Sequence, residues 1–204
     1  MQFRTLAFAA TLAFGAPALA ANPAVDLETT AGTIRIELYA DAAPKTVANF
    51  LEYVKAKHYD GTQFHRVIDG FMIQGGGYTA DFKPKPTRPP VVNEAEISSK
   101  AGILNTPGTI AMARTSDPNS ATSQFFINVN DNKSLNFRFP DATGMGYTAF
   151  GKVVSGMDVV SKIAKAPKGK AVPPGVPISP NDLPKDAIVI NKASVVDAAA
   201  APAK

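Results

Sequence analysis

The sequence has no cysteine, no tryptophan and only two histidines among its 204 residues. Without cysteine, a disulfide framework, thiol catalysis and thiolate metal sites are all excluded. The two histidines, His58 and His65, are too few for a typical zinc site, so we expect no metal ion. The lack of thiols fits an oxidising compartment but does not require one.

Clusters of positive charge are also missing. The chain has 21 Lys and Arg residues against 17 Asp and Glu, a net charge of +4, and the basic residues are scattered along it. Because a nucleic-acid partner selects a basic patch or stripe, we expect no nucleic-acid binding.

No apolar run is long enough to cross a membrane. Leu6 to Phe14 is almost wholly apolar, follows Arg4 and precedes the small-residue pattern Ala18-Leu19-Ala20. This layout is typical of a secretory signal peptide over residues 1–20, cleaved near Ala20. The run is shorter than the roughly 20 apolar residues that a span requires, so no membrane anchor is expected.

Residues 21–196 have the length of one domain, and neither a repeat nor a linker divides them. One helix is predicted over Pro44–Lys57, because proline suits its first position and apolar residues from Val47 to Val54 recur at helical spacing. A second is predicted over Met157–Ala164. The alanine-rich end, 197–204, is predicted to be a disordered tail.

Short apolar runs bounded by glycine, proline and asparagine predict about eight strands. The expected strands are Val25–Thr30, Thr33–Leu38, Phe64–Ile68, Phe71–Gln74, Thr109–Ala113, Gln124–Val129, Thr148–Val154 and Ile188–Val196. Proline-rich residues 167–184 show no periodicity and are expected to be loop. The pattern is mainly β and fits a barrel or a sandwich without choosing between them.

Two segments carry most of the functional information. The first runs from Phe64 to Gly76 and holds an arginine, Arg66, within a strand-like run that leads to Phe-Met and then to glutamine and glycines. The second runs from Gly108 to Arg114 and continues at Ser123–Asn128. Small residues at Ala111 and Ala113 would leave room for a ligand to lie against that strand.

These segments resemble the signature blocks of the cyclophilins, which are peptidyl-prolyl cis/trans isomerases. The resemblance rests on FHRVI, GFMIQGG and SQFFI and extends from about Val25 to Val195. It is strongest for the bacterial periplasmic branch, in agreement with the signal peptide. It implies a closed eight-stranded antiparallel β-barrel capped by two α-helices, and a periplasmic isomerase that needs no cofactor.

The resemblance also implies where the site lies. It places Arg66, Phe71 and Gln74 at catalytic positions. It places the substrate-binding positions at Met72, Ala113, Arg114, Thr115, Gln124, Phe126, Leu135 and Tyr147. By contrast, His65 is adjacent to Arg66 on a strand and should point to the opposite face, as a core histidine.

An arginine suits this reaction for a physical reason. Rotation about an X-Pro amide is slow because the nitrogen lone pair is delocalised, which gives a barrier of roughly 20 kcal/mol. In the twisted state the nitrogen regains its lone pair, so a fixed donor aimed at it stabilises that state alone. The guanidinium group is always charged and carries five donors in a rigid fork.

The chain departs from the best-studied eukaryotic cyclophilins at three positions. Ser134 stands where they have a tryptophan that binds cyclosporin, so weak cyclosporin binding is expected. Tyr147 and Arg114 replace a histidine and an asparagine. These changes leave the sequence preference around proline open, and Arg114 would favour acidic neighbours.

The expected partners are proline-containing polypeptides, and the protein is expected to be a monomer. An alternative is a binding module that holds such segments without speeding their isomerisation, but such a module has no evident need for Arg66. A structural envelope protein ranks lower, because the chain has no repeat, anchor or lipidation cysteine. The two hypotheses differ in one observable, because an enzyme accelerates isomerisation at catalytic concentrations and a binding module binds without acceleration.

Overall fold

The computed structural model describes residues 22–196, so the predicted signal peptide (1–20) and tail (197–204) lie outside the described residues. The strands are β1 (Ala24–Thr29), β2 (Gly32–Leu38), β3 (Arg66–Ile68), β4 (Met72–Gly75), β5 (Thr109–Met112), β6 (Phe125–Asn128), β7 (Ala149–Ser155) and β8 (Ile190–Val196). The helices are α1 (Pro44–Lys55), α2 (Ala95–Lys100) and α3 (Met157–Ala164), with 3₁₀ turns η1 (Lys133–Leu135) and η2 (Pro180–Asp182).

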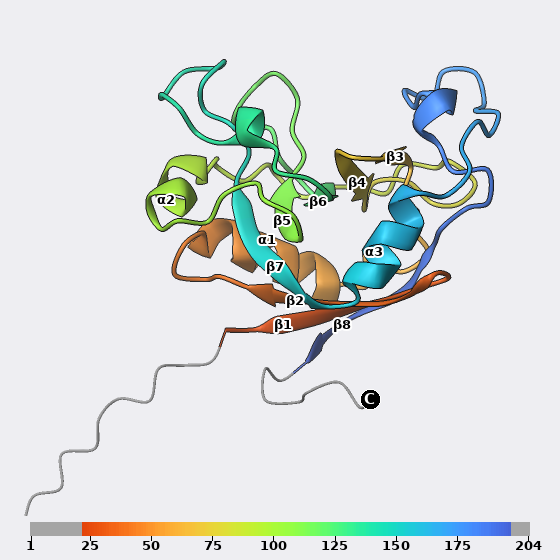
Figure 1. Ribbon diagram of the computed structural model, residues 1–204, viewed down its shortest axis with the longest axis horizontal. Coiled ribbons are helices and arrows are strands. Elements are labelled where there is room, and N and C mark those ends of the chain that lie inside the picture. The colour runs from red at the N-terminus through yellow and green to blue at the C-terminus, as the bar shows by residue number, and fades with distance from the viewer. Residues whose placement is uncertain (1–21, 197–204) are drawn as a thin grey trace, which may run out of the picture.

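The eight strands form one antiparallel sheet in the order β3-β4-β6-β5-β7-β2-β1-β8 (Figure 1). The expected closed barrel is wrong, because the sheet is an open half-barrel whose edge strands β3 and β8 are not paired with each other. The residues just before β3 approach the other edge through an isolated bridge between Gln63 and Val189 and through flanking backbone hydrogen bonds, such as that from Phe64 N–H to the Ile188 carbonyl oxygen (2.9 Å). These bonds end before β3 begins at Arg66, so β3 and β8 form no ladder.

The expectation of two helices is also wrong, since the described residues contain a third, α2. Its six residues follow a proline-rich stretch and make less than two turns, which is too short for a helical period to be recognised in the sequence. The other elements lie within about two residues of their predicted bounds. The loop at 167–184 is confirmed apart from η2.

The main core lies between the sheet and helices α1 and α3. It contains Phe50 of α1, Ile163 of α3, and Ile73, Ile110 and Phe125 of the strands, each 0 % exposed. Among residues 22–196, no helix is long and apolar enough to cross a membrane.

Helix α1 is capped by a residue far away in the sequence. Its N-cap residue, Ala43, has no side chain that could accept a hydrogen bond. Instead, the buried Glu94 carboxylate accepts hydrogen bonds from the backbone N–H groups of Lys45 (3.1 Å) and Thr46 (2.8 Å). An acidic group here also complements the positive end of the helix dipole, so α1 is fixed against the loop that precedes α2.

Candidate active site

One row of residues crosses the sheet and forms the base of the site. Arg66 on β3 is paired with Gln74 on β4, Gln74 with Phe126 on β6, and Phe126 with Ala111 on β5. Residues that are directly paired on adjacent strands have neighbouring side chains on one face of the sheet. The row therefore places a cationic, an amide, an aromatic and a methyl group side by side, with the smallest at Ala111.

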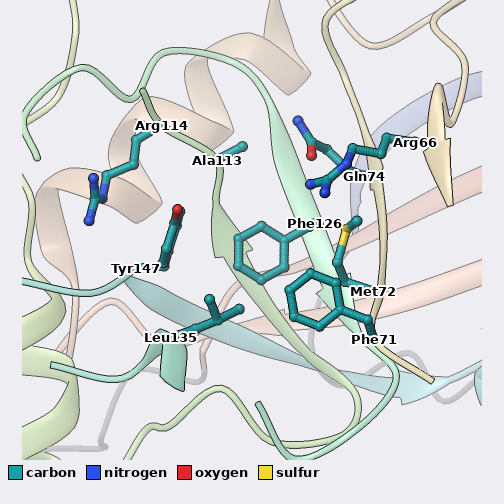
Figure 2. A pocket seen from close by; sticks show the side chains of 9 residues that line it. All are labelled: Arg66, Phe71, Met72, Gln74, Ala113, Arg114, Phe126, Leu135 and Tyr147. Carbon is teal, nitrogen blue, oxygen red and sulfur yellow. The ribbon is translucent and has the colours of Figure 1, made fainter. Parts of the chain in front are cut away.

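A hollow of about 100 Å³ opens over this row. It is lined by Arg66, Phe71, Met72, Gln74, Ala113, Arg114, Phe126, Leu135 and Tyr147. Figure 2 shows Arg66 and Gln74 on one side, Arg114 and Tyr147 on the other, and Phe126 between them. Pockets for whole ligands typically hold about 300–1,000 Å³, so this hollow has the size for a single small side chain or ring.

A second hollow of about 230 Å³ adjoins the first and shares Gln74, Ala113 and Arg114 with it. Here lie the two remaining predicted site residues, Thr115 and Gln124. The Gln74 Nε2 group donates a hydrogen bond of 2.9 Å to Gln124 Oε1, which joins the two hollows along one polar edge. The structure thus brings all the predicted site residues together.

Sequence reasoning missed Ser120 and Thr122, which line the second hollow. It also missed a buried cluster of asparagines behind the first. Asn105 Nδ2 donates to the carbonyl oxygens of Leu135 (3.1 Å) and Tyr147 (3.2 Å). Asn132 Nδ2 donates to the Phe71 carbonyl oxygen (2.9 Å). Three walls of the hollow are therefore fixed through their backbones, which no local sequence signal reveals.

Within the part of the chain that the structure describes, Arg66 has one hydrogen-bond partner. Its Nε donates to Asp182 Oδ2 at 3.4 Å. Within residues 22–196 its two terminal nitrogens make no hydrogen bond, so their donors remain available beside the hollow. Asp182 was not among the predicted site residues, because it comes from the loop after α3, 116 residues further along the chain.

Arg114 is held differently. Its guanidinium lies 4.5 Å from the centre of the Tyr147 ring, a cation–π contact. Its Nε donates to the Gly146 carbonyl oxygen (2.9 Å) and its Nη1 to the Thr115 carbonyl oxygen (2.8 Å). These contacts fix Arg114 and Tyr147 together as the wall opposite Arg66.

His65 is buried, with 4 % exposure, and its ring stands edge-on to Tyr78 at 5.0 Å. Burial lowers the pKa of His65 to about 4, which favours the neutral ring at neutral pH. Burial of His58 lowers its pKa as well. Within the described residues, no group of three or more His, Cys, Asp or Glu side chains could hold a metal ion.

The fold and the site define a β-protein in which a small hollow with aromatic and polar walls lies beside an arginine whose terminal nitrogens make no hydrogen bond within residues 22–196. The family model described as "cyclophilin type peptidyl-prolyl cis-trans isomerase" matches residues 24–195. The chain therefore belongs to the cyclophilin family of peptidyl-prolyl cis-trans isomerases, as its signature segments predicted.

Curated relatives agree with this assignment. A peptidyl-prolyl cis-trans isomerase of Streptomyces antibioticus is 49% identical over 172 residues, covering 84% of this chain and 98% of the relative. Peptidyl-prolyl cis-trans isomerase B of Escherichia coli is 48% identical over 171 residues, with the same coverage of 84% and 98%. A peptidyl-prolyl cis-trans isomerase of Acinetobacter baylyi is 56% identical over 147 residues, covering 72% of this chain and 74% of the relative.

Solved structures give the same result. A cyclophilin type peptidyl-prolyl cis-trans isomerase of Cryptosporidium parvum has a TM-score of 0.66 and 25% identity, covering 86% of this chain and 98% of its own. A second structure of that protein, in the presence of the dipeptide Ala-Pro, has a TM-score of 0.65 and 25% identity and covers 85% and 98%. The chain is a cyclophilin-type peptidyl-prolyl cis-trans isomerase.

Proposed function

We propose that this isomerase acts on X-Pro bonds of exported proteins, with the proline ring in the first hollow and Arg66 donating to the prolyl nitrogen. The single observation that supports this role most is the state of Arg66: its terminal nitrogens have no hydrogen-bond partner within residues 22–196, yet they border a hollow of ring size whose walls include Phe71 and Phe126.

The reaction is a purely kinetic task, because the cis and trans forms differ by only about 0.5–1 kcal/mol. A donor that bound the planar amide equally well would lower KM without raising kcat. Arg66 avoids this, because the prolyl nitrogen can accept a hydrogen bond only when the amide is twisted. No proton is transferred and no covalent bond forms, so the proposal requires neither a metal nor a cofactor.

The remaining side chains hold the two ends of the rotating bond. Phe126, Met72 and Leu135 present apolar surface to the proline ring, with Phe71 at the edge of the hollow (Figure 2). Gln74 binds the substrate backbone next to Arg66, and its hydrogen bond to Gln124 at 2.9 Å fixes its amide. The ring is held on one side while the preceding carbonyl group rotates on the other.

The test compares three forms of residues 21–204 in an NMR or protease-coupled assay on a short Ala-Pro peptide: wild type, Arg66→Ala and Arg88→Ala. Arg88 is a matched control, because its side chain is 47% exposed, against 44% for Arg66, and it too is paired with one carboxylate, Glu52. Wild type and Arg88→Ala should accelerate isomerisation equally. Arg66→Ala should lose about 100-fold, roughly 2.7 kcal/mol of barrier.

Two results would contradict the proposal. If wild type binds the peptide without speeding isomerisation, the chain is a binding module. If Arg66→Ala keeps full activity, another group stabilises the twisted amide. The expected monomer can be checked on the same samples by sedimentation.

The export part of the proposal rests on Arg4, the apolar run and Ala18-Leu19-Ala20, which lie outside residues 22–196. In a bacterium with two membranes, we expect the full chain in the periplasmic fraction with a new N-terminus at Ala21, as determined by mass spectrometry. The double substitution Ala18→Arg and Ala20→Arg should block cleavage. Uncleaved wild-type protein in the cytoplasm would refute this part alone.

A further inference from the structure

The proline-rich segment after α3 forms a structured arm, defined here as residues 167–184. Its base is closed by two backbone hydrogen bonds: Gly169 N–H donates to the Leu183 carbonyl oxygen (3.0 Å) and Lys185 N–H to that of Pro167 (2.8 Å). Lys168 Nζ donates to the Ala164 carbonyl oxygen at the end of α3 (3.0 Å). The arm therefore leaves the core at a fixed place.

The return half of the arm is anchored by burial. Leu183 is 0 % exposed and Ile178 is 8 % exposed, on either side of η2. Pro180 begins that 3₁₀ turn, where its fixed φ angle reduces the freedom of the chain. The acidic residue at the end of η2, Asp182, is thus held between two buried contacts, and the arm stands beside β3 and β4 (Figure 1).

From this position Asp182 reaches the site. Its Oδ2 lies 3.4 Å from Arg66 Nε, and Asp182 is not among the residues that line the first hollow. A third hollow of about 450 Å³ separates the arm from the strands here. Asp182 is the only carboxylate among the residues that line this hollow and the two described above.

The contact with Nε has a geometric consequence. A free arginine side chain samples many rotamers, and its donors form a rigid planar fork. When Nε is bound, rotation of that plane is restricted and the terminal N–H groups are held in fewer orientations. Arg66 lines the first hollow, so these groups are held beside the place where the proline ring is expected to bind.

We propose that Asp182 is a positioning residue that orients the Arg66 guanidinium toward the substrate amide. This inference rests on the proposed function of Arg66 and adds a role for the arm. Asp182 touches no substrate. It acts by reducing the number of orientations that Arg66 must give up in the twisted-amide state, so its removal lowers kcat and leaves KM almost unchanged.

The test measures kcat and KM separately for Asp182→Ala, Asp182→Asn and the matched control Asp186→Ala. Asp186 is exposed, follows the arm directly and carries the same charge, but does not reach Arg66. Because exposed ion pairs couple weakly, kcat of Asp182→Ala should fall by roughly 1.5-fold to fivefold. Asp182→Asn keeps an acceptor and should fall less, and Asp186→Ala should match wild type.

Two further readouts separate positioning from a general structural effect. In the Arg66→Ala background, Asp182→Ala should cause no further loss, since its effect passes through Arg66. The Arg66 Nε–H signal, identified by its absence in Arg66→Ala, should show increased fast motion in Asp182→Ala by NMR relaxation.

The outcomes are distinct from those for the proposed function. If wild type accelerates isomerisation and Arg66→Ala does not, but Asp182→Ala matches Asp186→Ala, the inference fails while the function stands. A rise in kcat on removal of Asp182 would also overturn it, because the carboxylate would then restrain Arg66 from its substrate. Equal losses in the wild-type and Arg66→Ala backgrounds would indicate a structural role instead.

Discussion

Alternate residues of β4, β5 and β6 point to two different environments. On one side Ile73, Ile110 and Phe125 join the main core with α1 and α3. On the other side their immediate neighbours Met72, Ala111 and Phe126 form a smaller cluster beneath the first hollow. Because strand side chains alternate, each short segment contributes to stability with one face and to the site with the other.

The two faces differ in content as well as direction. The inner face is filled by large rings in edge-on contact, such as Phe125 with Tyr59 at 5.4 Å and with Phe50 at 5.7 Å. The outer face combines small and polar groups with an edge-on ring pair, Phe126 and Tyr147 at 5.7 Å, and its buried apolar cluster is smaller. Substitutions on the two faces should therefore have separable effects. Those on the inner face should mainly lower stability, and those on the outer face should mainly lower activity.

The largest effect is expected on the inner face. Phe125→Ala should lower the free energy of unfolding by about 3–5 kcal/mol, because it removes a fully buried ring and leaves a cavity. Leu135 is half-buried and packs against the outer cluster. Leu135→Ala should lower the free energy of unfolding by only about 1 kcal/mol and should raise KM. Urea unfolding measures the stability losses, and the peptide assay measures KM. Equal stability losses in the two variants would contradict the expected difference between the two faces.

His65 is buried although it is adjacent to the exposed Arg66, so the pKa of His65 tests the difference between the two environments. Since the folded-state pKa of His65 is about 4, below the usual 6.5, the unfolded chain binds the proton more tightly between these values. Stability contributed by neutral His65 is full above pH 6.5 and is lost as the pH falls toward 4, by about 3 kcal/mol. NMR titration of the ring checks the cause, and a midpoint near 6.5 would contradict it.

The asparagine cluster behind the first hollow should affect both stability and KM. Asn105→Ala removes the donors to the Leu135 and Tyr147 carbonyl oxygens. The Leu135 oxygen still accepts from the Tyr147 N–H group (2.8 Å), but the Tyr147 oxygen loses its donor, at a cost of about 1–3 kcal/mol. The loosened walls should raise KM severalfold. Asn130→Ala, at an exposed position, is the control and should change neither value.

The smallest effect concerns cyclosporin on the outer face. Ser134 is exposed in η1, next to Leu135, where cyclophilins that bind the drug strongly have tryptophan. Wild type should bind cyclosporin weakly, and Ser134→Trp should tighten binding about tenfold, or 1.4 kcal/mol, by adding a hydrogen-bond donor and apolar surface. Lys133→Trp is the control, and nanomolar affinity of wild type by calorimetry would contradict the account.

The alternation explains how much the sequence could reveal. Short apolar runs bounded by glycine, proline and asparagine predicted all eight strands, and the residues of the row from Arg66 to Phe126 lie in segments with family signatures. The contacts that could not be predicted join distant parts of the chain: Glu94 to the start of α1, Asn105 to the hollow, and Asp182 to Arg66. Such contacts depend on tertiary packing, which also decides that the sheet stays open rather than closing into a barrel.

The most direct test of the central claim measures peptide binding and bound-state isomerisation together, by NMR exchange on an Ala-Pro peptide with wild type and Arg66→Ala. If Arg66 acts only on the twisted amide, the variant should bind the peptide within about twofold of wild type while its bound-state exchange rate falls about 100-fold. Loss of binding in parallel with loss of rate, or an unchanged rate, would contradict the role assigned to Arg66.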